Sequence, residues 1–247
     1  MTKSSIRLTF LSAVATLLVA SGSLMHVSRV NAMAYIAAHD MDGHMSMTKR
    51  RPVQPGDKER ADVIVVAARR FALQYLDYRK AEADGYKIFM PQLPQRVYHF
   101  TQNAAGAAAQ FKFNPDRPTS LLYEKTKGSE PGYKLIGVMY TDRFTATEDE
   151  LDQRVPLSIA QWHVHTNLCL PPRGQHVDWL DPEVQFGLAG SIRTEAACEK
   201  AGGSFMPHLF GWMVHVYPFE TDAEKVWSAG MEDDRGMQHE SMPGMKM

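Results

Sequence analysis

The chain has 247 residues, of which 44% are hydrophobic and 22% are charged, with 27 basic and 28 acidic side chains. This is the composition of a globular protein, and it excludes a chain disordered throughout, a coiled coil and a multi-span membrane protein. The formal net charge of −1 lacks the basic excess that is typical of nucleic-acid binding, so no nucleic acid is expected as a partner.

Residues 1–34 have the features of a secretory signal peptide. Lys3 and Arg7 precede an apolar run over residues 8–20, which has the length of a signal-peptide core and is too short to span a bilayer. Two small-residue cleavage sites follow, one ending at Ala32 and one ending at Ala34. We therefore predict that the protein is periplasmic or secreted after signal-peptide removal, with no membrane span in the mature chain. An uncleaved N-terminal anchor is the alternative.

The rest of the chain divides into a leader, one domain and a tail. Residues 35–56 are polar and contain Met and His, which predicts a flexible leader. Residues 57–230 carry the periodic patterns expected of a single domain. Residues 231–247 lack periodicity and predict a tail rich in Met and His.

The domain is predicted to begin with a helix over residues 57–84. Asp57 can cap its N-terminus, and Gly85 can supply the left-handed conformation that ends a helix. Apolar residues recur between them at helical spacing. One face of this helix is therefore expected to pack against the rest of the domain.

Strand patterns follow the predicted helix. We expect a short helix over residues 194–201 and strands over residues 97–101, 120–125, 133–141, 158–169 and 209–217. One helix followed mainly by antiparallel strands predicts an α+β domain, in which the N-terminal helix packs on a curved sheet or partial β-barrel.

The chain contains two cysteines, Cys169 and Cys198. In an oxidising compartment an even pair is most simply a disulfide, which would stabilise the fold by about 3–4 kcal/mol if chain entropy accounts for the effect. A pair of thiolate metal ligands is the alternative.

Several histidines fall on or beside predicted strands. His163 and His165 are alternate residues of one strand, so their side chains project from the same face. Two imidazoles can share one ion and leave further coordination positions to be filled from elsewhere. We predict a mononuclear metal site with His163 and His165 as first ligands, His208 and His215 next and His99 last. For each histidine taken alone, a hydrogen-bonded structural role is the alternative.

Methionine and histidine are also concentrated at the two ends of the chain. Methionine normally fills gaps in cores, which polar segments containing Gly and Pro cannot form. Thioether and imidazole ligands together select soft ions such as Cu(I), so copper is the predicted metal, with zinc, iron and manganese as alternatives. An oxidisable segment without specific function is the other interpretation. The predicted soft-metal ligands are His39, Met41, His44, Met45, Met47, Met237, His239, Met242, Met245 and Met247.

Five short motifs resemble a family of exported bacterial proteins that has no assigned activity. They are ADGY (83–86), YHF (98–100), LLYE (121–124), LIGV (135–138) and WHVH (162–165). The resemblance extends over roughly residues 60 to 217 and implies export and a common core. The His-x-His strand also resembles that of cupins. The cupin pattern places a Glu shortly after the second His, whereas Thr166, Asn167, Leu168 and Cys169 follow here.

Together these patterns predict an exported copper-binding protein that captures, buffers or delivers copper, with a copper-trafficking protein as a partner. One alternative is a metal-dependent oxidoreductase that uses an open coordination position. Another is a barrel that binds a small ligand without metal. The sequence contains no Gly-x-Ser-x-Gly, no His-Glu-x-x-His and no glycine-rich phosphate motif.

Overall fold

A computed structural model describes residues 44–91, 95, 97–126, 132–177 and 184–229. The chain divides into two compact units, residues 1–42 and 43–247, and all described residues belong to the second. The predicted signal peptide and the predicted tail lie outside the described residues. Within the described ranges, no helix is both long enough and apolar enough to cross a membrane.

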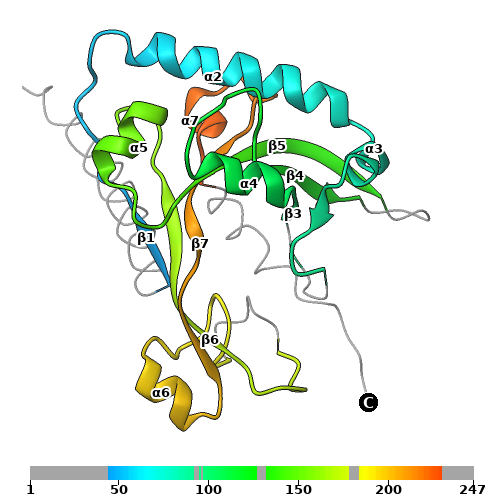
Figure 1. Ribbon diagram of the computed structural model, residues 1–247, viewed down its shortest axis with the longest axis vertical. Coiled ribbons are helices and arrows are strands. Elements are labelled where there is room, and N and C mark those ends of the chain that lie inside the picture. The colour runs from blue at the N-terminus through cyan, green and yellow to red at the C-terminus, as the bar shows by residue number, and fades with distance from the viewer. Residues whose placement is uncertain (1–43, 92–94, 96, 127–131, 178–183, 230–247) are drawn as a thin grey trace, which may run out of the picture. The chain divides into compact units, whose positions relative to one another are not determined.

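The described part is an α+β structure built on one antiparallel sheet of seven strands (Figure 1). The strands are β1 (Met45–Met47), β2 (Lys87–Ile88), β3 (Val97–Thr101), β4 (Ser120–Lys125), β5 (Tyr133–Asp142), β6 (His163–Leu170) and β7 (Ser204–Val216). Their order across the sheet is β1-β6-β7-β5-β4-β3-β2. Because β1 and β2 lie at opposite edges, the sheet is open and does not close into a barrel.

The predicted helix over residues 57–84 is divided into three pieces. They are α2 (Asp57–Ala72), a 3-10 turn η1 (Leu73–Tyr75) and α3 (Tyr78–Ala83). Gly56, with a φ of 88°, precedes α2, and Asp57 does not cap it, because its carboxylate accepts hydrogen bonds from the Gln54 N–H and the Ser158 hydroxyl. The remaining helices are α4 (Asn103–Ala109), α5 (Glu148–Arg154), α6 (Glu195–Lys200) and α7 (Ala223–Val226).

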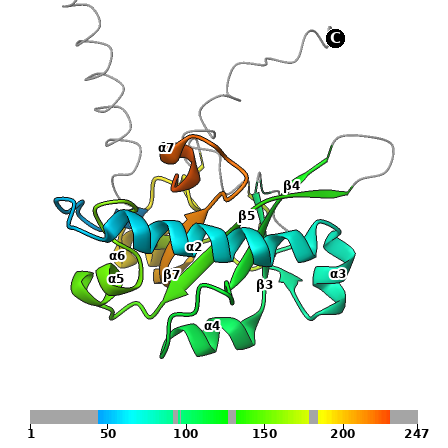
Figure 2. The ribbon, with the colours of Figure 1, turned by 90° about the horizontal axis from the view of Figure 1, so that it is seen from above.

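One face of the sheet carries the main hydrophobic core, and α2 lies across it (Figure 2). Ile64 and Ala68 belong to the same buried cluster as Leu121, Val138 and Val214, which come from β4, β5 and β7. Successive side chains of a strand point to opposite faces. The neighbours of these core residues therefore project from the other face.

The sheet curls toward the face opposite α2. Strands β3 and β7 are separated by β4 and β5, which would place them about 14 Å apart in a flat sheet. The ring centroids of His99 on β3 and His215 on β7 are nevertheless only 5.5 Å apart. Gly137 on β5 permits this approach, because a Cβ atom there would lie 2.6 Å from the Val216 carbonyl oxygen. We call this the concave face.

Strands β6 and β7 extend as a ribbon with α6 at its far end (Figure 1). Cys169 at the end of β6 and Cys198 in α6 form a disulfide, with their Cα atoms 5.5 Å apart. The predicted disulfide is therefore confirmed. Since the two sulfur atoms are bonded to each other, the alternative of a thiolate metal site is wrong.

Candidate metal site

Four of the five predicted core histidines meet on the concave face. The ring centroids of His163 and His215 are 4.9 Å apart, and their planes are nearly perpendicular. His165 lies 5.7 Å from His163, and His99 lies 5.5 Å from His215. These four residues are called the histidine cluster below.

Strand alternation explains how each ring reaches this face. His163 and His165 flank Val164 on β6, and His215 lies between Val214 and Val216 on β7. Val214 and Val216 are part of the main core on the other face of the sheet. The histidines must therefore project away from α2, as the two-residue period of a strand requires.

Two ring nitrogens of the cluster are buried away from solvent. His163 is 2% exposed and His215 is 8% exposed. Among the described residues, neither Nδ1 of His163 nor Nε2 of His215 has a hydrogen-bond partner. Buried polar atoms in native proteins are nearly always paired, so these exceptions require an explanation. Trp162 Nε1, beside His163, is another such atom in the described part of the chain.

The other hydrogen bonds of the cluster orient the rings. Nδ1 of His99 lies 3.2 Å from the Val97 carbonyl oxygen. A carbonyl can only accept, so we assign the proton of His99 to Nδ1 and its lone pair to Nε2. The Tyr217 hydroxyl lies 3.5 Å from Nδ1 of His215 and can orient that ring in the way that outer groups orient metal-bound imidazoles.

Burial keeps the cluster neutral. Desolvation, followed by repulsion from neighbouring histidines, lowers the pKa of His163 to about 3 and that of His99 to about 4. Desolvation likewise lowers the pKa of His165 to about 4, although His99 and His165 are only half-buried and feel water more than the other two. Metals bind neutral imidazole, so the rings are in the ligating form at neutral pH.

The pKa of His215 lies well below its ordinary value for the same reasons. Burial is the main cause, and the charges that His163, His99 and His165 would carry add to it. The backbone of Ala229 opposes this decrease, but it forms no hydrogen bond of good geometry with Nε2. The ring of His215 is therefore neutral at neutral pH.

The distances between the rings fit a shared ion, but the ring nitrogens do not point at one common position. Two imidazoles on one tetrahedral ion, with metal–nitrogen bonds near 2 Å, have centroids about 5 Å apart. The cluster's neighbouring centroids lie 4.9–5.7 Å apart. In the part of the chain that the structure describes, no three His, Cys, Asp or Glu side chains are already arranged to hold a metal. Binding would therefore require the rings to rotate toward one another.

His208 is separate from the cluster, contrary to the prediction. It stands opposite Thr166, whereas the next residue, Leu209, stands opposite His165, so alternation turns His208 to the other face. Its ring stacks on Phe144 with centroids 4.1 Å apart. Its Nδ1 lies 2.7 Å from the Phe210 carbonyl oxygen and donates to it.

The predicted ligands at the N-terminal side have different surroundings. His44 is 9% exposed, and its Nε2 donates to the Gly190 carbonyl oxygen at 2.6 Å, which gives this ring a structural role. Met45 and Met47, expected in the leader, form β1 and pair with the His-x-His strand. The predicted ligands outside the described residues are His39, Met41, Met237, His239, Met242, Met245 and Met247.

Two buried methionines on the concave face were not predicted as site residues. Met213 stands opposite His163, and Met139 stands opposite His215. Both pack with Leu122 and Tyr217 in a small hydrophobic cluster. Their signal in the sequence was the alternation of Met213 with His215 on one strand, but core packing explains a buried methionine equally well.

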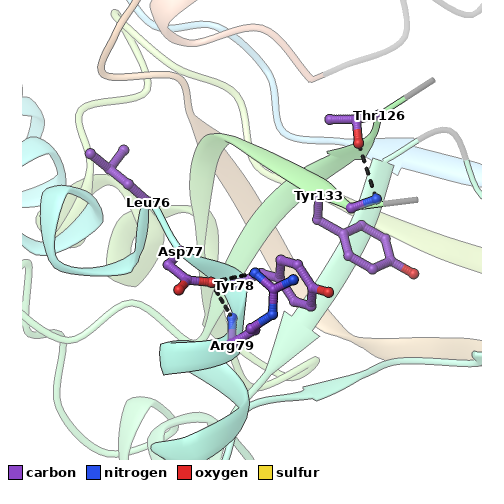
Figure 3. Close-up of a pocket in the computed structure, with 7 residues that line it drawn as sticks. Leu76, Asp77, Tyr78, Arg79, Thr126 and Tyr133 are labelled. Atoms are coloured by element: carbon purple, nitrogen blue, oxygen red, sulfur yellow. Dashed lines mark hydrogen bonds and ion pairs between the residues drawn. The ribbon is translucent and has the colours of Figure 1, made fainter. Parts of the chain in front are cut away.

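A hollow of about 360 Å³ lies away from the histidine cluster, between η1, α3 and the β4–β5 hairpin (Figure 3). Asp77, Tyr78 and Tyr133 line it, and the Asp77 carboxylate pairs with Arg79. Asp77 also caps α3 by accepting from the Arg79 N–H. These contacts account for the charged groups as local structure, and we assign no function to the hollow.

Comparison with protein-family models, with curated proteins and with solved structures gave no match to this chain. The resemblance to an exported bacterial family, and the resemblance of the His-x-His strand to cupins, therefore stay predictions. The function must be argued from the histidine cluster and the side chains around it.

Proposed function

We propose that this protein binds copper outside the cytoplasm through the histidine cluster, and that it captures, buffers or delivers the ion. The observation that carries the proposal is the pair of buried nitrogens, Nδ1 of His163 and Nε2 of His215, which have no hydrogen-bond partner among the described residues. Their rings are in contact, and burial favours the neutral state of both. A bound ion would satisfy both nitrogens at once.

Copper is favoured over other imidazole-binding metals by the composition of the chain. Imidazole alone suits zinc, copper, iron and nickel. The methionines of the leader and tail add thioethers, which copper in its reduced state accepts and zinc does not favour. A copper-trafficking protein that supplies or receives the ion is the partner that this role implies.

The proposal is tested by metal analysis of the full chain purified from the periplasm of copper-supplemented cells. We expect copper in the wild-type protein and its loss in the variant His163→Ala/His215→Ala. His208→Ala is the matched control, because His208 is also on β7 but stacks on Phe144 outside the cluster. Circular dichroism verifies that each variant is folded. Full copper content in the double variant would overturn the proposal.

A second comparison separates the cluster from the ends of the chain. Deleting residues 231–247 removes the methionine-rich tail and leaves every described residue in place. We expect this variant to retain the copper ion bound by the cluster and to lose only additional, weaker binding. If deletion of the tail abolished all copper binding, the tail would be the copper-binding segment, and the cluster would take no part in binding.

A further inference from the structure

Methionine side chains stand next to the histidines in two strand pairs of the concave face, β1–β6 and β6–β7. On β1, Met47 is opposite His163 and Met45 is opposite His165. On β7, Met213 is opposite His163 from the other side. Directly opposed residues of antiparallel strands share a face, and their Cβ atoms are about 4.5–5.5 Å apart. His163 therefore has a thioether neighbour on each side.

This arrangement follows from the pairing of two short patterns. Met45-Ser46-Met47 and His163-Val164-His165 run antiparallel, so each methionine of one pattern meets a histidine of the other. Ser46 is exposed, whereas both methionines are partly buried. The β1 side chains that turn inward are thus the two methionines, whose thioethers are soft metal ligands.

We propose that the cluster is a mixed imidazole–thioether site for a soft monovalent ion, Cu(I) or Ag(I), in which Met47 and Met213 act as ligands beside His163 and His215. This inference rests on the proposed function and narrows it to one oxidation state. Two imidazoles and two thioethers fill four positions around the ion. Thioethers select Cu(I), whereas Zn(II) is bound by nitrogen, thiolate and carboxylate ligands.

Hydrophobic packing is the competing explanation for these methionines. Met213 is 4% exposed and packs with Leu122 and Met139, as a core methionine would. Leucine has nearly the volume of methionine, and exchanging the two usually costs less than about 1.5 kcal/mol of stability. The substitution Met→Leu therefore keeps the packing and removes only the sulfur, which separates the two explanations.

The test uses the full chain with Met47→Leu, Met213→Leu and both together. Met206→Leu is the matched control, since Met206 lies on β7 opposite Leu168, beyond the histidines. Cu(I) affinity is measured by competition with a chromogenic Cu(I) chelator under reducing conditions, at less than one equivalent of metal. Zn(II) affinity is measured on the same proteins, and X-ray absorption of the Cu(I) forms reports sulfur and nitrogen neighbours.

We expect each single variant to lose about tenfold or more in Cu(I) affinity and part of the sulfur scattering. The double variant should lose all of the sulfur scattering, and Zn(II) affinity should be unchanged in all three. Met206→Leu should bind both ions as the wild type does. Unchanged Cu(I) affinity in the double methionine variant, while His163→Ala/His215→Ala still abolishes copper binding, would overturn this inference and leave the proposed function intact. Wild-type Cu(I) affinity in the variant His163→Ala/His215→Ala would overturn both.

Discussion

Replacing His163 by leucine is expected to stabilise the metal-free protein while removing its proposed metal site. Nδ1 of His163 is buried and has no hydrogen-bond partner among the described residues, and the side chain is 2% exposed. A buried polar atom without a partner destabilises a fold by about 1–3 kcal/mol. Leucine is of similar size and carries no polar atom, so the penalty disappears with the substitution.

The size of the gain depends on how well leucine fits. A substitution of similar volume in a packed core usually costs up to about 1.5 kcal/mol. When this cost is subtracted from the penalty that the substitution removes, the free energy of unfolding should increase by roughly 1 kcal/mol. For a domain of this size, 1 kcal/mol corresponds to an increase of about 2–4 °C in Tm. The His163 substitution should therefore raise Tm by a few degrees.

His44→Leu is the matched comparison and should have the opposite sign. His44 is nearly as buried, at 9% exposed, but its Nε2 donates to the Gly190 carbonyl oxygen at 2.6 Å. Leucine would leave that carbonyl buried and unpaired, which should lower the free energy of unfolding by about 1–3 kcal/mol. Both variants replace histidine by leucine, so the difference between their free energies of unfolding reports whether the histidine has a hydrogen-bond partner.

The assay is thermal or urea unfolding of the chelator-treated full chain at neutral pH, followed by copper titration of the same samples. His163→Leu should melt above the wild type and bind copper weakly, and His44→Leu should melt below it and bind copper normally. If both variants are destabilised to the same degree, Nδ1 of His163 has a partner in the native protein. The reasoning that this ring is held ready for a metal would then be wrong.

Acidification should destabilise the metal-free protein below about pH 6.5, the ordinary histidine pKa, because burial lowers the pKa of His163 to about 3 and that of His215 well below normal. Each of these histidines contributes stability that is present above pH 6.5. The free energy of unfolding falls by roughly 1.4 kcal/mol per pH unit and per histidine as the pH decreases from 6.5 toward the pKa of the folded state. Thermal melts at stepped pH measure this slope, and the same slope in His163→Gln/His215→Gln would contradict the prediction. Gly137→Ala should destabilise the fold by about 1–3 kcal/mol and weaken copper binding, since its Cβ would lie 2.6 Å from a backbone oxygen where the sheet curls; wild-type copper affinity would show that this curvature is not needed. Replacing Cys169 and Cys198 by serine should lower the unfolding free energy by about 3–4 kcal/mol without changing copper stoichiometry, because the disulfide lies at the far end of the β6–β7 ribbon; loss of copper from the folded variant would refute that separation.

Local periodicity was sufficient to predict the longer strands and part of the histidine cluster, but not β1, β2, α4, α5 or α7. Alternation on one strand brought His163 and His165 to one face, and the structure places them there, 5.7 Å apart between centroids. The strand pattern over residues 97–101 correctly placed His99 on β3. These predictions succeed because the two-residue period is a property of the backbone and does not depend on distant contacts.

The prediction for His208 was wrong for a reason that the sequence contains. It assumed that the last strand begins at residue 209, whereas β7 begins at Ser204. Positions 208 and 215 differ by an odd number, so in one continuous strand they face opposite sides. The irregularity in the β6–β7 pairing inserts two extra residues of β7 between the partners of His163 and His165. An even insertion does not change which side of the sheet each residue faces. A longer strand prediction would have excluded His208 from the site.

The register between distant strands could not be predicted from local patterns. Met47 and His163 are far apart in the sequence, and their pairing depends on which strands become neighbours. A shift of one residue in the register would turn both methionines of β1 to the opposite face. The thioether neighbours of the cluster therefore become visible only with the fold.

The short edge strand β1 offers a route by which the proposed ion would reach the buried histidine cluster. His163 is almost fully buried, so an ion can reach it only if some element opens. β1 has three residues and a single partner strand, which makes its separation from β6 less costly than that of any strand paired on both sides. Backbone hydrogen bonds from Thr48 to Trp162 and from Thr166 to His44 hold its two ends. Separation between these ends would expose Met47 and His163, which are two of the four proposed ligands and stand opposite each other in this strand pair.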